Sequence, residues 1–267
     1  MSASGASAPQ VVFQQPGSMP SMPMGMSMSM QPLVIWAPMP TPIPGVPPGL
    51  EMLHGKEFVK VEQQHEWLEV FTGFEEANRY ILKDEKGAYM YFAAENSHFC
   101  ARWFLGTLRP FEMGIYDNIQ RHVINIIRPY KCDSCCCFCC LQTMEIQAPP
   151  GTPIGFVEQD CSCCLPKFRI LDEDKDVMFR IKGPCCTSSC CCRDVEFKIL
   201  DPEGENQVGR IAKKWSGIQE FFTDADNFAI EFPSNVDIKG KATLLAACFM
   251  IDYLYFEDSG GHDRLNQ

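Results

Sequence analysis

Hydrophobic and polar residues alternate along most of the chain between residues 78 and 215, in short runs separated by turn-forming residues. Successive side chains of a strand point to opposite faces, so this period of two predicts β-strands with one buried face. The expected strands lie at 80–83 and 88–93, 111–116 and 122–127, 144–146 and 154–157, 168–170 and 177–181, and 195–199. Short strands at this spacing favour an antiparallel β-sandwich or β-barrel.

A different pattern covers Ala242–Phe256, whose sequence ATLLAACFMIDYLYF is apolar on every side of a helix except at Thr243 and Asp252. Such a helix must be surrounded by protein or by lipid. Fifteen residues at ~1.5 Å each span roughly 22 Å, less than the ~30 Å hydrocarbon core. Flanking lysines before the run and acids after it suit a span whose N-terminal side is cytoplasmic. We predict a central buried helix, with a membrane span as the alternative, and its marker residues are Ala242, Leu245, Phe249, Asp252 and Phe256.

Charge divides the chain unevenly, because residues 1–50 contain no Asp, Glu, Lys, Arg or His. Proline and methionine are concentrated in this part, which predicts a disordered tail over residues 1–49. Its Pro-x-x-Pro spacing also fits a ligand for proline-binding domains. A folded domain is expected over 50–258 and a short polar tail over 259–267. The net charge of −11 disfavours direct nucleic-acid binding, and contact with anionic lipid requires a local basic patch or a bridging cation.

Fourteen of the 16 cysteines lie in three clusters, at 132–140, 161–164 and 185–192. The N-terminus lacks the pattern of a secretory signal, so we expect a reducing compartment without a disulfide scaffold. S-acylation suits the first cluster because it tolerates crowded thiols near a bilayer. Zinc and unmodified thiols are the alternatives there. For the other two clusters zinc and acylation both remain open, with candidate zinc ligands Cys161, Cys163 and Cys164, or Cys185, Cys186 and Cys190.

Asp224 and Asp226 occupy positions one and three of a loop that could supply oxygen ligands to calcium. The match to an EF-hand loop is poor, because position five is Phe228 and position twelve is Asn235. Calcium would bind such a loop with an affinity on the order of 10⁻⁴–10⁻³ M. The alternative is a turn that leads into a strand with Phe228, Ile230 and Phe232 pointing inward.

The densest basic stretch is Gly209–Trp215, with Arg210, Lys213 and Lys214. It fits a nuclear import signal, a contact with lipid headgroups, or the solvated face of a strand. The five histidines are scattered, and neither a nucleophile motif nor a glycine-rich phosphate loop occurs. We therefore predict that the protein is not an enzyme.

Several stretches together resemble the phospholipid scramblase family, in the family's order and over nearly all of residues 47–257. They are PPGLEML (47–53), YFAAE (91–95), RPYKCDSCCCFCCLQTMEIQAPPGTPIGFV (128–157), LPKF (165–168), GRIAKKWSGI (209–218), TDADNFAIEFP (223–233) and LLAACFMIDYLYFE (244–257). The cysteine block followed by IQAPPG is the most specific of these. The resemblance implies a tubby-like fold, in which a closed antiparallel barrel of about twelve strands encloses the hydrophobic C-terminal helix.

The resemblance also implies calcium-stimulated, ATP-independent and bidirectional movement of phospholipids between bilayer leaflets, with no headgroup preference. It places the protein on the cytoplasmic face of the plasma membrane, with a nuclear pool when it is not acylated. The alternative function is a palmitoylated, membrane-anchored interaction protein that affects scrambling indirectly.

Three sets of residues match the family's functional segments. The palmitoylation motif maps to Cys135, Cys136, Cys137, Cys139 and Cys140, with Phe138 where the family has Pro. The calcium segment maps to Asp224, Asp226, Phe228, Ile230, Phe232 and Asn235, the last replacing the family's Asp. The segment read by an import receptor maps to 209–218, with Lys213 and Lys214 as its basic core.

Overall fold

The computed structural model describes residues 35–63, 78–96, 110–131, 141–162, 165–185, 195–213 and 227–256. The chain divides into two units, residues 1–33 and 34–267, and every described residue belongs to the second. The expected palmitoylation motif, the two aspartates of the calcium segment and Lys214 lie outside the described residues.

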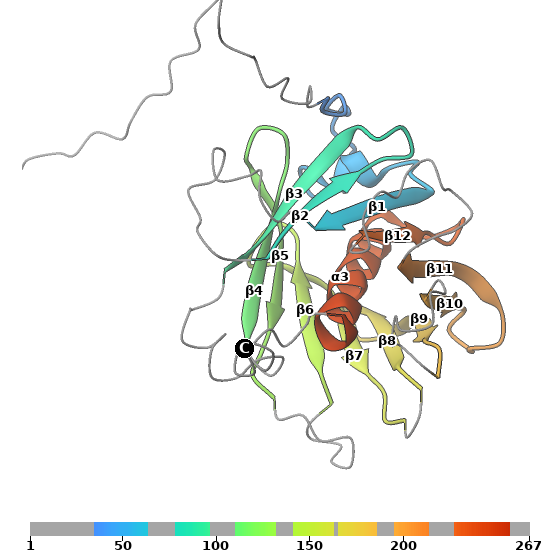
Figure 1. Ribbon diagram of the computed structural model, residues 1–267. Helices are drawn as coiled ribbons and strands as arrows, with labels where there is room; N and C mark the ends of the chain where they lie inside the picture. Colours follow the sequence, from blue (N-terminus) through green and yellow to red (C-terminus); the bar gives the residue numbers. More distant parts are fainter. Residues whose placement is uncertain are drawn as a thin grey trace, which may run out of the picture. The chain divides into compact units, whose positions relative to one another are not determined.

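Twelve strands form one closed barrel, in which each strand is antiparallel to both neighbours and β1 closes the ring against β12 (Figure 1). The predicted barrel is therefore confirmed, and the sandwich alternative is wrong. The strands are β1 (Phe58–Gln63), β2 (Arg79–Lys83), β3 (Tyr89–Asn96), β4 (Phe111–Tyr116), β5 (His122–Arg128), β6 (Thr143–Gln147), β7 (Pro153–Gln159), β8 (Lys167–Asp172), β9 (Val177–Lys182), β10 (Val195–Leu200), β11 (Gln207–Lys213) and β12 (Asn227–Glu231).

Tight turns at one end of the barrel are held by aspartates that end a strand or directly follow one. In the β2–β3 turn, Oδ1 of Asp84 accepts hydrogen bonds from the backbone N–H groups of Lys86 and Ala88, at 3.0 and 2.9 Å. Aspartate favours such turns because its short side chain can bond to its own backbone. The same arrangement recurs at Asp117 and Asp172. Asp201 differs slightly, because its Oδ1 accepts from the N–H of Glu205 and its Oδ2 from that of Asn206.

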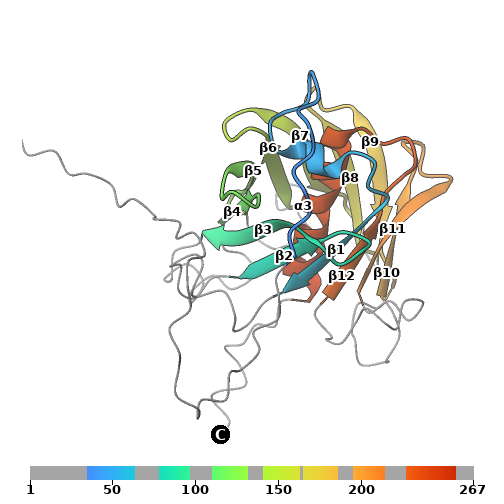
Figure 2. The same ribbon diagram turned by 90° about the horizontal axis from the view of Figure 1, so that it is seen from above.

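The helix α3 (Ile238–Tyr255) runs through the middle of the ring of strands, as Figures 1 and 2 show. Asp237 caps its start, where the carboxylate accepts a 2.8 Å hydrogen bond from the N–H of Gly240. The helix therefore begins four residues before the expected Ala242. Every residue from Gly240 to Tyr253 is buried, which explains why the sequence has no polar face.

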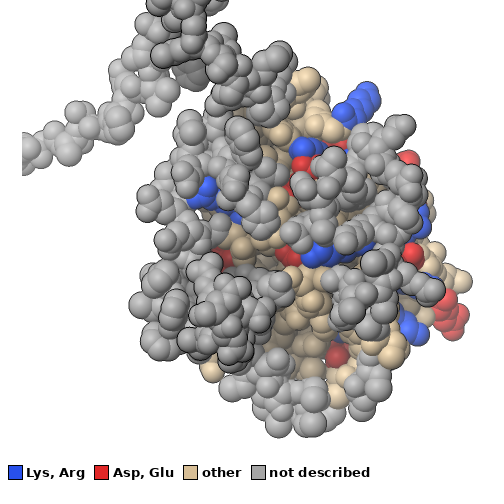
Figure 3. Space-filling view, viewed as in Figure 1, with Lys and Arg blue, Asp and Glu red and all other residues tan. Residues whose placement is uncertain are grey.

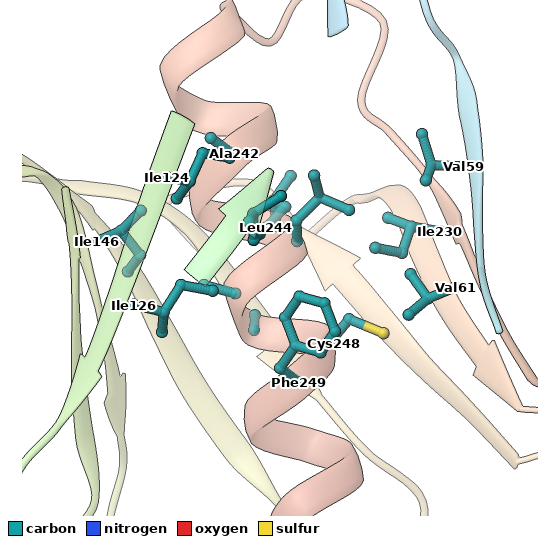
Figure 4. Close-up of a cluster of buried hydrophobic side chains, with 14 of the residues drawn as sticks. Val59, Val61, Ile124, Ile126, Ile146, Ile230, Ala242, Leu244, Cys248 and Phe249 are labelled. Atoms are coloured by element: carbon teal, nitrogen blue, oxygen red, sulfur yellow. The ribbon is translucent and has the colours of Figure 1, made fainter. Parts of the chain in front are cut away.

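The core is formed between the inner face of the barrel and α3. Figure 4 shows Val59 and Val61 of β1, Ile124 and Ile126 of β5, and Ile230 of β12 around the helix residues Leu244, Cys248 and Phe249. The predicted buried helix is thus confirmed for this structure. None of the helices in the described ranges combines the length and the apolar character needed to cross a bilayer.

Two parts of the fold were not predicted from the sequence pattern. Strand β1 and the short 3-10 helix η1 (Leu50–Leu53) precede the region where alternation was recognised. Residues ahead of η1, which the sequence analysis assigned to the tail, also contact the barrel. Ala37 donates a 2.8 Å backbone hydrogen bond to Tyr89, and Tyr89 donates one of 2.9 Å to Ile35.

Candidate functional site

The connections at the two ends of the barrel differ in length. Because neighbouring strands are antiparallel, β1, β3, β5, β7, β9 and β11 all end on the same side of the barrel. We call this side the long-connection end. All three cysteine clusters and the segment 214–226 lie in connections that leave from it, between β5 and β6, β7 and β8, β9 and β10, and β11 and β12.

The helix α3 also ends on this side, and aromatic side chains surround its last turn. Tyr253 lies 4.8 Å from Phe111 between ring centroids. The ring centroid of Tyr255 lies 6.3 Å from that of Phe168, the second residue of β8, and 6.1 Å from that of Phe197, the third residue of β10. The final turn is therefore fixed against strands on several sides of the barrel.

Asp252 is the one acidic residue inside the predicted apolar helix, and it is buried with 5% exposure. Its Oδ2 accepts a 2.7 Å hydrogen bond from the hydroxyl of Tyr80 on β2. A buried carboxylate is costly unless it is hydrogen-bonded or paired, so this contact is a physical reason for its place in the core. It also ties α3 to the barrel wall.

Arg128, the last residue of β5, is buried beside the same turn with 1% exposure. Its guanidinium donates a 2.7 Å hydrogen bond to Oε1 of Gln142 and lies 4.3 Å from the ring centroid of Tyr253. A cation near the C-terminus of a helix interacts favourably with the helix dipole. Arg128 lies seven residues before Cys135, the first cysteine of the expected palmitoylation motif, yet its side chain is buried inside the barrel and is not available to lipid headgroups.

The basic stretch on β11 is divided between the surface and the core. Arg210 is partly exposed and forms a 2.7 Å ion pair with Glu231 on β12. Lys213 is 9% exposed, with its ammonium 4.4 Å from the ring centroid of Phe256 and 5.2 Å from that of Phe228. The structure does not present these two residues as a free basic peptide, because β11 is paired on both sides.

The structure does not bring the residues expected for calcium together, because strand β12 runs between the first of them and Asn235. Phe228, Ile230 and Phe232 are 1%, 0% and 4% exposed and belong to the core, so they offer no side-chain oxygen. Asn235 is exposed in the turn between β12 and α3, at the opposite end of the barrel from the long connections. A strand rises ~3.3 Å per residue, so Asn227 and Glu231 are roughly 13 Å apart and the segment does not close into a loop.

Two cysteines of the later clusters are described, and both Cys161 and Cys185 are exposed free thiols. Cys248 on α3 is instead fully buried, and burial raises the pKa of its thiol well above the ordinary value, with the nearby Asp252 carboxylate acting in the same direction. Within the described ranges, no three His, Cys, Asp or Glu side chains come together to hold a metal ion. The zinc hypothesis for the two clusters therefore stays a prediction.

The charged side chains of the described surface are mixed in sign. On the face shown in Figure 3, Lys and Arg atoms lie close to Asp and Glu atoms near the centre. Ion pairs on the barrel wall have the same character, such as Arg169 with Glu158 and Asp160 at 3.1 and 2.7 Å. The described surface shown there is not a uniformly basic area.

The sequence pattern gave Tyr80 no role, and it suggested contacts with lipid headgroups for Arg128 and a position just ahead of the apolar helix for Lys241, not the buried contacts that the structure shows. Lys241 is 8% exposed and donates hydrogen bonds to the carbonyl oxygens of Leu53 and Lys56, at 3.2 and 2.6 Å. The partner of Tyr80 is 172 residues away in the sequence, and the partners of Lys241 are backbone groups. The only available signal was a charged or hydroxyl residue inside an otherwise apolar pattern.

These contacts define a class of protein: a closed antiparallel β-barrel filled by its own C-terminal helix. Buried polar contacts hold this helix to the segment ahead of β1 near its start and to the barrel wall near its end. A family model described as Scramblase matches residues 37–258, which include the whole barrel and α3. The chain belongs to the scramblase family.

Its relatives include phospholipid scramblase 1 of Homo sapiens, with 48% identity over 86% of this chain and 73% of that protein. Phospholipid scramblase 2 of Bos taurus is 48% identical over 85% of this chain and 78% of its own. Phospholipid scramblase 4 of Homo sapiens is 39% identical over 85% and 69%. No solved structure matches the chain.

Proposed function

We propose that this protein moves phospholipids between the two leaflets of a bilayer without consuming ATP, in both directions and with calcium as a stimulant. The observation that carries the proposal is the 48% identity to two proteins named phospholipid scramblases, over 85–86% of this chain. Lipid translocation of this kind needs no covalent step, so it requires no catalytic residue.

The lumen of the barrel does not provide the lipid path in this proposal. A headgroup crosses the hydrocarbon core only along polar groups or water. The lumen is occupied by α3, whose residues from Gly240 to Tyr253 are buried against the barrel. Lipids would therefore move along the outer surface of the protein or through bilayer that the protein distorts.

Attachment to the membrane follows from S-acylation of the five cysteines of the palmitoylation motif. Each buried methylene of an acyl chain contributes roughly 0.8 kcal/mol, and two or more chains anchor a folded domain stably. These cysteines lie between β5 and β6, so the acyl chains would leave from the long-connection end. We place the acylated protein on the cytoplasmic face of the plasma membrane and the unacylated protein partly in the nucleus.

The calcium part of the proposal is limited to Asp224 and Asp226, because the following residues are strand residues with buried apolar side chains. Two carboxylates imply weak binding, on the order of 10⁻⁴–10⁻³ M. The double variant Asp224→Asn/Asp226→Asn should abolish the calcium response. Asp174→Asn, an exposed turn residue of the opposite end, serves as the matched control.

The direct test uses protein purified from eukaryotic cells and reconstituted in liposomes with a fluorescent lipid in both leaflets. A membrane-impermeant reductant bleaches the outer leaflet only, about half of the dye. Scrambling brings inner-leaflet dye within its reach, so added calcium should increase the bleached fraction well beyond half, without ATP. Bleaching that stops at half, as in empty liposomes, would reject the proposal.

A second candidate function is a membrane-anchored interaction protein that affects scrambling indirectly. The enclosure of α3 within the barrel supports it, because the apolar residues of this helix are buried against protein and none of the described helices is long and apolar enough to cross a membrane. This candidate predicts that the acylated protein binds proline-recognition domains through residues 1–49 but leaves lipids unscrambled in purified liposomes. The same bleaching experiment therefore separates the two functions.

A further inference from the structure

Four residues on neighbouring strands form what we call the outer row: Arg79 on β2, Ala94 on β3, Gly114 on β4 and Asn125 on β5. They lie directly opposite one another in the strand register. Opposite residues of antiparallel strands project from the same face of a sheet. The neighbouring Tyr80 points inward to Asp252, so the outer row faces the outside of the barrel.

Both ends of the outer row carry polar atoms that lack a partner. Arg79 is 8% exposed, its Nε is buried without a hydrogen bond, and its side chain makes no ion pair with any other described residue. Asn125 is 6% exposed, and its Oδ1 is likewise buried without a donor. Leaving such groups unpaired is costly, most of all for a charged guanidinium. Among the described residues this pair therefore suits a ligand that offers an acceptor to Arg79 and a donor to Asn125.

The middle of the outer row is made of small residues next to aromatic ones. A Cβ added at Gly114 would lie 2.6 Å from the hydroxyl of Tyr116, so a side chain at this position would displace the ring. Tyr116 in turn stacks on His122, with 4.9 Å between ring centroids. The Nε2 of His122 is a third buried atom without a hydrogen-bond partner on this face.

The charges at the two ends are opposite. Arg79 is positive, while the exposed Glu112 accepts a 2.6 Å hydrogen bond from Nδ2 of Asn125 at the other end. Strands are spaced ~4.8 Å apart, so three spacings separate Arg79 from Asn125 by roughly 14 Å, less the reach of the two side chains. A ligand with an anionic group near one end and a cationic or hydrogen-bond-donating group near the other complements this arrangement.

We propose that the outer row binds the headgroup of a phospholipid, with the phosphate at Arg79 and the ammonium or hydroxyl group at Asn125 and Glu112. The inference rests on the proposed function and deepens it, because it assigns a headgroup site to the outer wall of a barrel whose lumen α3 fills. Arginine suits the phosphate, since its fork of N–H donors matches two phosphate oxygens.

The experiment measures the binding of glycerophosphoethanolamine, which carries the phosphodiester and the ammonium but no acyl chains. Ligand-observed NMR titration with the purified full chain gives the dissociation constant. The variant Arg79→Gln should weaken binding about tenfold or more, whereas Arg79→Lys should retain part of it because the positive charge remains. Asn125→Ala should weaken glycerophosphoethanolamine more than inorganic phosphate, which has no ammonium group.

Arg169→Gln is the matched control. It removes an outward-facing arginine of β8 that already forms ion pairs with Glu158 and Asp160. It should bind the probe like the wild type, and thermal unfolding of each variant shows that the barrel is intact. Inorganic phosphate that binds as tightly as glycerophosphoethanolamine would mean that the site takes free phosphate, which would overturn the proposal. Equal affinity of Arg79→Gln and wild type would overturn it as well.

Liposome bleaching with the same variants separates this inference from the proposed function. If the wild type scrambles lipids and Arg79→Gln binds glycerophosphoethanolamine as tightly as the wild type does, the headgroup site is rejected and the proposed function stands. If glycerophosphoethanolamine binding depends on Arg79 but the wild type does not scramble lipids, the headgroup site stands and the proposed function is rejected.

Discussion

The contact between Tyr80 and Asp252 gives the sharpest prediction about how α3 is held. The substitution Tyr80→Phe removes one hydroxyl and keeps the ring, which packs edge-to-face on Phe249 at 5.0 Å. The hydroxyl donates a 2.7 Å hydrogen bond to a buried carboxylate. Hydrogen bonds to charged groups contribute roughly 1.5–3 kcal/mol, so the variant should lose about 2 kcal/mol of unfolding free energy.

Urea unfolding monitored by circular dichroism measures this loss, with Tyr89→Phe as the matched control. Tyr89 lies at the start of β3 and is only half-buried, so its variant should change stability by less than about 0.5 kcal/mol. In an Asp252→Leu background, Tyr80→Phe should cost much less than in the wild type, because the acceptor is already gone. A loss of equal size in both backgrounds would show that the hydroxyl acts elsewhere and would refute the reasoning.

Three further predictions concern packing, pH and membrane attachment. Gly155→Ala should destabilise the barrel by about 1–3 kcal/mol, since the added Cβ would lie 2.5 Å from Oγ1 of Thr243 on α3, as urea unfolding can show. Burial alone would raise the pKa of Asp84, but hydrogen bonds from Lys56 and the turn lower it. The wild type should therefore be more stable than Asp84→Asn at pH values above ~3.9, the pKa of an aspartate in the unfolded chain. This difference should disappear as the pH falls through the lower pKa of Asp84 in the folded protein. Replacing the five palmitoylation-motif cysteines by Ala should move the protein from the membrane to the soluble fraction of cells.

Each of these has a clear contradicting result. A Gly155→Ala variant as stable as the wild type would mean that α3 lies farther from β7 than the structure shows. If the wild type became more stable relative to Asp84→Asn as the pH fell toward 2, the pH dependence would have the opposite sign to the one expected from a lowered pKa of Asp84. A cysteine variant that stays fully in the membrane fraction after alkaline carbonate washing would indicate a true membrane span.

The strands were predictable wherever both partners of a hairpin lie close in the sequence. In β6, Met144 and Ile146 point inward and alternate with partly exposed neighbours, and the turn after them contains Pro149 and Gly151. Strand β1 has the same alternation at Val59 and Val61, but its partners do not form a local hairpin with it: β12 lies more than 160 residues away. The pairing that closes the barrel has no local turn to signal it.

The start of α3 and its polar contacts could not be placed from the sequence for related reasons. Lys239 and Lys241 suggested that the apolar helix begins after them, yet the cap is Asp237 and Lys241 is buried against backbone carbonyls. Tyr80 and Asp252 are 172 residues apart. A hydrogen bond over that distance depends on the closed barrel, which local periodicity does not specify.

The position of α3 during activity is the central claim, and Cys248 reports on it without any substitution. Its thiol is fully buried, whereas Cys161 and Cys185 are exposed and serve as internal controls. Acylated protein on liposomes would be treated with N-ethylmaleimide, with and without calcium, and the labelling rate of each cysteine measured by peptide mass spectrometry. We predict that Cys248 stays unlabelled in both conditions, while Cys161 and Cys185 are labelled wherever they carry neither zinc nor an acyl chain. Labelling of Cys248 at a rate close to theirs once calcium is added would show that α3 leaves the barrel, and would contradict the account.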